Sequence, residues 1–153
     1  MAARTAVVTA SGGKGIALVM KVLVLTSEPI TAEQLRSALE ADIDPEDAEV
    51  MVVAPALAES AMKFWMSDAD DAIGRAEQVR RESIERLGEE GVSATGDTGE
   101  ADPYTAIEDA LKTFDADRIV LFAHEPGDQR YREDLDDREL TERFGLPVDR
   151  AVV

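Results

Sequence analysis

The sequence has no cysteine, a single histidine and few aromatic residues, which make up 5% of its 153 residues. Without cysteine, the chain has no disulfide framework, no thiolate metal site and no cysteine nucleophile. No run of about 18 apolar residues occurs, so we expect no membrane-spanning helix. Apolar residues nevertheless amount to 44%, which is ordinary for a globular protein and argues against a disordered chain. The length is that of one domain.

Basic residues are scarce as well, since 16 lysines and arginines stand against 33 aspartates and glutamates, for a formal net charge of −17. The acidic residues are spread along the chain, as on a solvated surface, and a high-salt or high-GC source would produce the same excess. Because such a chain repels a phosphate backbone, we expect no nucleic-acid partner. Asp68, Asp70 and Asp71 are too closely spaced for a calcium loop and suit helix capping, so we predict no metal site.

Residues 1–19 lack the features of a targeting signal and of a phosphate loop. A Ser-Gly-Gly stretch interrupts their short apolar run before it reaches the length of a signal-peptide core, so we expect a cytoplasmic protein. The lysine after these glycines is followed by glycine, not by the Ser or Thr of a P-loop. We therefore predict that residues 1–19 form a flexible leader, with Met20 as an alternative natural start. Residues 20–153 are expected to form the domain.

After residue 20, short apolar runs alternate with amphipathic segments. Five runs are typical of strands buried in a parallel sheet, at residues 21–26, 48–54, 92–96, 118–123 and 148–153. Four segments between them have helical spacing or helix-start signals, at about residues 31–39, 70–88, 102–114 and 132–144. Because parallel strands are joined by crossover helices, this order predicts a doubly wound α/β three-layer sandwich with a five-stranded parallel sheet.

Local signals support these helices. Thr31 and Gln34 form a capping box, and Asp102 followed by Pro103 is typical of a helix start. In the second segment, spacings of three and four place one set of residues on the buried side, namely Ile73, Ala76, Val79, Ser83, Ile84 and Leu87.

The carboxyl ends of the predicted strands are where a ligand is expected, because open parallel sheets bind ligands there, near the point where the strand order reverses. The candidate ligand-binding residues at these ends are Thr26, Ser27, Ala54, His124 and Gly127. His124 could act as a base for a Ser27 nucleophile. However, no glycine-serine elbow surrounds Ser27, and a histidine that hydrogen-bonds a neighbouring loop is the simpler interpretation. We therefore assign no catalytic residue.

One connection concentrates large side chains in a chain that otherwise has few aromatics. Met62, Phe64, Trp65 and Met66 lie together between the second strand and the second helix. Such a group can form a surface for a partner or a ligand. A lid packed over the sheet is the interpretation that we favour.

Residues 91–120 carry three motifs. Gly96-Asp-Thr-Gly follows a short strand, Asp102-Pro-Tyr-Thr-Ala-Ile opens a helix, and Ala116-Asp-Arg-Ile-Val leads into the next strand. This arrangement resembles the second half of the universal stress protein family. There, a glycine-containing strand end precedes a Pro-led helix with Ala-Ile, and an Ala-Asp pair precedes an Ile-Val strand. The order of elements from residue 20 to residue 153 is similar to that family as well.

The resemblance implies a five-stranded parallel sheet and a homodimer formed through the last strand. One branch of the family binds ATP through three glycines and a Ser or Thr after the fourth strand. Here only Gly127 is available before Gly145, and Glu125 and Asp128 would repel phosphates. The acidic residue that many ATP-binding members carry at the end of the first strand is replaced by Thr26. The resemblance therefore implies the branch without ATP, and neither ATP nor AMP is expected as a cofactor.

These observations predict a cytoplasmic binding or regulatory module, similar to universal stress proteins, that takes a small-molecule ligand and is not an enzyme. The alternative is a nucleotide-binding protein or small hydrolase that uses the strand-end cleft. A purely structural interaction protein is the third hypothesis.

Overall fold

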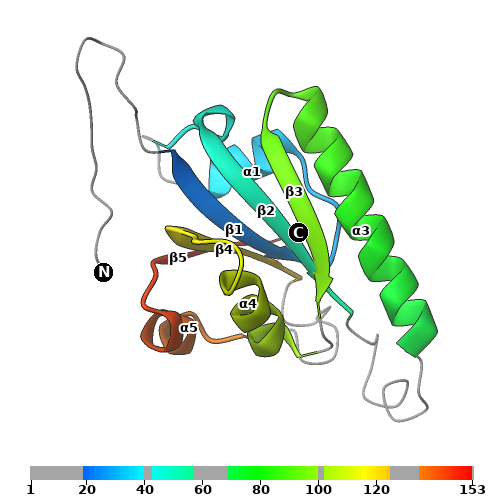
Figure 1. Cartoon of the computed structure of the whole chain (residues 1–153). Helices are drawn as coiled ribbons and strands as arrows, with labels where there is room; N and C mark the ends of the chain where they lie inside the picture. The colour runs from blue at the N-terminus through cyan, green and yellow to red at the C-terminus, as the bar shows by residue number, and fades with distance from the viewer. Residues whose placement is uncertain (1–18, 40–42, 57–68, 100–101, 125–134, 153) are drawn as a thin grey trace.

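The computed structural model describes residues 19–39, 43–56, 69–99, 102–124 and 135–152. Within them, five parallel strands form one sheet in the order β3-β2-β1-β4-β5 (Figure 1). The strands are β1 (Met20–Thr26), β2 (Ala48–Pro55), β3 (Ser93–Gly99), β4 (Arg118–Ala123) and β5 (Val148–Val152). The helices are α1 (Ala32–Ala38), α3 (Ala69–Glu89), α4 (Pro103–Leu111) and α5 (Asp137–Phe144), with a short 3₁₀ turn, η2 (Pro45–Asp47). The predicted five-stranded α/β fold is confirmed.

Helices cover both faces of the sheet (Figure 1). In β1, Val22 and Val24 belong to the core beneath α1 and α3. The alternate residues Leu23 and Leu25 belong to the core beneath α4 and α5. Successive side chains of a strand point to opposite faces, so a strand that is covered on both faces must be apolar at every position. This explains the uninterrupted apolar run of β1.

Two of the predicted helix starts are confirmed in atomic detail. At α1, Thr31 Oγ1 accepts a hydrogen bond from Gln34 N at 3.2 Å, and Gln34 Oε1 accepts one from Thr31 N at 2.9 Å. At α4, Asp102 Oδ1 accepts from Tyr104 N at 3.2 Å, and Pro103 occupies the first turn. In both cases a side chain satisfies a backbone N–H group that the helix itself leaves without a partner.

The last helix begins later than the predicted residue 132. Leu135 and Asp136 are not helical, and α5 starts at Asp137. Asp136 has extended backbone angles and accepts hydrogen bonds from Arg138 N and Glu139 N. The helix therefore starts where this aspartate caps it, because the capping residue must itself lie outside the helix.

The buried side of α3 is rotated from the predicted one. The residues of α3 that are buried are Ala72, Ala76, Val79, Ser83 and Leu87. The expected contribution of Ile73 is wrong, since this residue is 44% exposed, and Ile84 is only half-buried. A start at Ala72 continues the same spacing of three and four, and the smaller alanine allows α3 to approach the sheet closely.

Strand ends also differ slightly from the prediction. β3 runs from Ser93 to Gly99 instead of residues 92–96, and β2 includes Pro55, which was expected to follow it. Residues 1–18, the group from Met62 to Met66, Gly127 and Val153 lie outside the described residues, so the predictions made for them stay predictions.

Gly96 allows α3 to pack closely on β3. A Cβ atom at this position would lie 2.6 Å from Ile84 Cδ1, 2.7 Å from Arg80 Cγ and 3.1 Å from Val52 O. We expect Gly96→Ala to lower the free energy of unfolding by about 1–3 kcal/mol, because α3 and its side chains must shift. Urea unfolding followed by circular dichroism measures the change.

The control is Gly74→Ala in α3, the helix that packs against Gly96. A Cβ atom there meets nothing within 4 Å, so alanine should raise the free energy of unfolding by about 0.5–1 kcal/mol through its better helix propensity. A stabilising effect of alanine at both glycines would contradict the close contact between α3 and β3.

Candidate functional site

The strand order reverses at β1, which lies between β2 and β4. The chain leaves β1 through α1 on one face, and it returns to the other side of β1 through α4 on the opposite face. Ligands bind at such a reversal because the diverging connections leave an opening at the carboxyl ends of the strands. Thr26, Ser27, Ala54 and His124 all lie at this edge of the sheet, as predicted.

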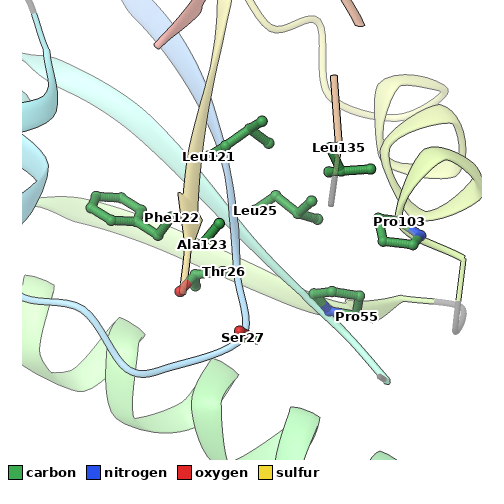
Figure 2. A pocket seen from close by; sticks show the side chains of 9 residues that line it. All are labelled: Leu25, Thr26, Ser27, Pro55, Pro103, Leu121, Phe122, Ala123 and Leu135. Atoms are coloured by element: carbon green, nitrogen blue, oxygen red, sulfur yellow. The ribbon is translucent and has the colours of Figure 1, made fainter. Parts of the chain in front are cut away.

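Two small hollows open at these strand ends. The first, called here the apolar hollow, is lined by Leu25, Thr26, Ser27, Pro55, Pro103, Leu121, Phe122, Ala123 and Leu135 (Figure 2). The second, called here the Ser27–Arg75 hollow, is lined by Ser27, Ala54, Pro55, Ala72, Arg75, Ala76 and Val79. Each has a volume of about 10 Å³, which is about the room that one water molecule needs. Ser27 and Pro55 belong to both.

The Ser27 hydroxyl is the unusual group of this site. Ser27 is only 6% exposed, and its Oγ atom is buried without a hydrogen-bond partner among the described residues. A buried hydroxyl without a partner costs about 1–3 kcal/mol, so most buried polar groups in proteins have one. The hydroxyl lies at the reversal of the sheet, which is where open parallel sheets bind ligands.

The neighbouring hydroxyl of Thr26 is engaged in a local turn. Thr26 Oγ1 donates to Glu28 O at 2.6 Å and accepts from Glu28 N at 3.1 Å. These two bonds fix the direction in which the chain leaves β1 and so the place of Ser27. Thr26, which is 1% exposed, therefore shapes the site through the backbone.

Ser83 holds the same loop from the side of α3. Its fully buried Oγ atom accepts a hydrogen bond from Ile30 N at 3.1 Å. The loop is thus held at Glu28 by the Thr26 turn and at Ile30 by α3. This places Ser27 in a firmly supported segment, which reduces the ordering that a ligand would have to bring about.

His124 contacts the loop after β1, as the simpler interpretation predicted. Its Nε2 atom lies 2.9 Å from Glu28 Oε2, and the histidine side chain is 15% exposed. A base oriented by a carboxylate is half of a catalytic arrangement, and a nucleophile bonded to the base is the other half. Ser27 Oγ has no partner among the described residues, so the hydrogen bond from Ser27 to His124 is not formed.

Ala54 is completely buried and packs against Ala76 and Val79 of α3. It can offer a ligand only its backbone and methyl group. Arg75 is a site residue that sequence reasoning missed. Arg75 lies three residues after Ala72 and four before Val79, so it is on the side of α3 that faces the sheet. The predicted buried side began at Ile73 and did not include Arg75.

Tyr104 connects α4 with α5. Pro103 at the start of α4 and Leu135 just before α5 both line the apolar hollow. The Tyr104 hydroxyl donates to Glu139 Oε1 at 3.2 Å and accepts from Asp136 N at 3.4 Å. Burial raises the pKa of Tyr104 above its ordinary value of 10.0, and the carboxylates of Glu139 and Asp136 raise it further, against a lowering by the Asp136 backbone bond. Tyr104 is therefore a neutral donor at neutral pH.

Among the described residues, no group of three or more His, Asp or Glu side chains is arranged to hold a metal ion. None of the helices in this part of the chain is long and apolar enough to cross a membrane. Scans of known protein-family models and of curated proteins found no match to the chain.

Two buried serines allow a test of the site, because substitution by alanine should have opposite effects. Ser83→Ala leaves the buried Ile30 N–H without a partner and should lower the free energy of unfolding by about 1–3 kcal/mol. Ser27→Ala removes a hydroxyl that has no partner among the described residues, and it should raise the free energy of unfolding by about 1 kcal/mol in buffer of low salt. Urea unfolding measures both.

Exposed Ser37 in α1 serves as a third position, where alanine should change stability by no more than about 0.5 kcal/mol. If Ser27→Ala destabilised the protein as Ser83→Ala does, the Ser27 hydroxyl would have a structural partner and the ligand site would lose its basis.

Proposed function

We propose that the chain is a binding or regulatory module, similar to universal stress proteins, which takes a small ligand at the carboxyl ends of β1, β2 and β4. The observation that carries this proposal is the buried Ser27 hydroxyl, which has no hydrogen-bond partner in the described part of the chain and lies where the sheet reverses. We place the protein in the cytoplasm and infer a role in a stress response from the resemblance of residues 91–120 to that family.

We infer binding without turnover because the groups expected of a hydrolase are not joined. His124 bonds to Glu28, and Ser27 has no bond to His124 that would activate it. We also infer that ATP is not the ligand, since the chain has one glycine, Gly127, where the ATP-binding branch has several, and acidic residues flank it. Without those glycines, backbone amides cannot approach the phosphates closely.

The alternative, a nucleotide-binding protein or small hydrolase, is favoured by one observation. The pair of His124 and Glu28 would become a general base if a substrate brought Ser27 or a water molecule within reach of the imidazole. This requires a rearrangement of a loop that Thr26 and Ser83 hold in place.

Thermal unfolding with ATP, ADP or AMP, with and without Mg²⁺, separates the two functions. We expect a shift in Tm below about 1 °C at millimolar nucleotide, because weak binding adds little to stability. His124→Ala should leave Tm and oligomeric state nearly unchanged. A clear shift with ATP, or ester hydrolysis that His124→Ala abolishes, would favour the alternative.

We propose in addition that two copies of the chain pair through β5. This strand lies at the edge of the sheet beside β4, and its Val152 side chain is 58% exposed. An edge strand offers backbone N–H and C=O groups to a further strand, and two-fold pairing is the commonest way in which identical chains use it.

Light scattering after gel filtration should give a mass of twice 16.6 kDa. Val152→Lys should weaken the dimer by about tenfold or more, because lysine on an edge strand opposes pairing of strands. Ile73→Lys on α3, whose side chain is 44% exposed, is the matched control and should leave the dimer intact. A monomer at high concentration, or equal effects of both substitutions, would contradict pairing through β5.

A further inference from the structure

Ser27 and Arg75 both line the Ser27–Arg75 hollow, and the Ser27 hydroxyl is buried without a hydrogen-bond partner among the described residues. We propose that this hollow binds one anionic atom, which is either a halide ion or a single oxygen of a carboxylate or phosphate. This inference rests on the proposed function, because it specifies the chemistry of a ligand that binds at the same strand ends.

The hydrogen-bonding groups of this hollow favour an anion over water. A serine hydroxyl can donate one hydrogen bond, and a guanidinium carries five N–H donors, so it can hold a protein partner and still donate to a ligand. The other side chains that line the hollow are those of alanine, proline and valine. A bound water must also donate its own hydrogens, and among the described residues that line the hollow the one side-chain acceptor is Ser27 Oγ. An anion needs donors alone.

The size of the hollow limits what can enter it. Its volume of about 10 Å³ is close to the room that one water oxygen needs, so no more than a single atom can enter it. A whole phosphate group is too large, so a larger ligand would place one oxygen in the hollow and leave the rest outside. Hydrogen bonds to a charged atom are about twice as strong as neutral ones, which suits a site with only two donor side chains.

The electrostatics make such a site selective. The net charge of −17 repels anions from most of the surface, although salt screens this repulsion beyond about 8 Å at physiological ionic strength. Arg75 is half-buried on the side of α3 that faces the sheet, so its positive charge acts in a less polar medium than water. Nonspecific binding of anions to this protein should accordingly be weak.

Chloride is a direct probe, because the ³⁵Cl resonance broadens when the ion binds to a protein. We expect the full chain to broaden this line in a saturable way. Ser27→Ala and Arg75→Gln should each weaken chloride binding by about tenfold, the loss of one charge-assisted hydrogen bond. Arg81→Gln, an exposed arginine of the same helix, is the matched control for charge and should leave the broadening unchanged.

Competition distinguishes the two sources of the anion. Acetate or inorganic phosphate that reverses the broadening would identify one oxygen of a larger ligand, and broadening that only bromide reverses would identify a halide site. Absence of saturable broadening, or its persistence in Ser27→Ala, would overturn the proposal. If broadening were absent while Ser27→Ala still stabilised the protein, the anion site would be wrong and the strand-end ligand proposal would stand.

A measurement on the unaltered protein removes any dependence on the folding of variants. Crystals soaked in bromide should show an anomalous peak within hydrogen-bonding distance of Ser27 Oγ and the Arg75 guanidinium. Peaks at the surface alone would overturn the proposal.

Discussion

The burial of β1 on both faces and along both edges is the constraint on which the rest of the molecule depends. Val22, Leu23 and Val24 are completely buried, and the strand pairs with β2 on one side and with β4 on the other. Two helix layers are therefore needed, and the chain must cross from one half of the sheet to the other. The same constraint carries Ser27, the residue that follows the strand, into the interior, where it is only 6% exposed.

Ser27 and Ser83 are both buried, but only Ser83 has a hydrogen-bond partner among the described residues. Ser83 is buried with a partner, Ile30 N, and it ties α3 to the loop after β1. Ser27 is buried without one in the part of the chain that the structure describes, and it lines a hollow together with Arg75. Buried polar groups in proteins nearly always have a hydrogen-bond partner, so the exception at Ser27 is the observation that points to a ligand. A charge of −17 spread over the surface leaves a sheltered arginine as a rare place for an anion.

Local patterns predicted those elements whose cause is local. The capping box at Thr31 and the Asp102–Pro103 start need only neighbouring residues, and both are confirmed. The start of α5 was wrong because several acidic residues precede it, and tertiary contacts decide which of them becomes the cap. Ile73 was wrong for a related reason, since a helix with apolar residues at adjacent positions leaves its rotation to the packing against β2 and β3.

The sequence by itself determined the order of strands and helices, the parallel sheet and the edge of the sheet where Ser27 and His124 lie, because apolar runs and caps act over a few residues. Only the tertiary structure decided what these residues contact. It placed His124 against Glu28, left the Ser27 hydroxyl without a partner among the residues described, and brought Arg75 to the hollow that Ser27 lines. Such contacts join segments about 50 to 100 residues apart, and their geometry depends on how helices rotate and pack, which periodicity does not specify.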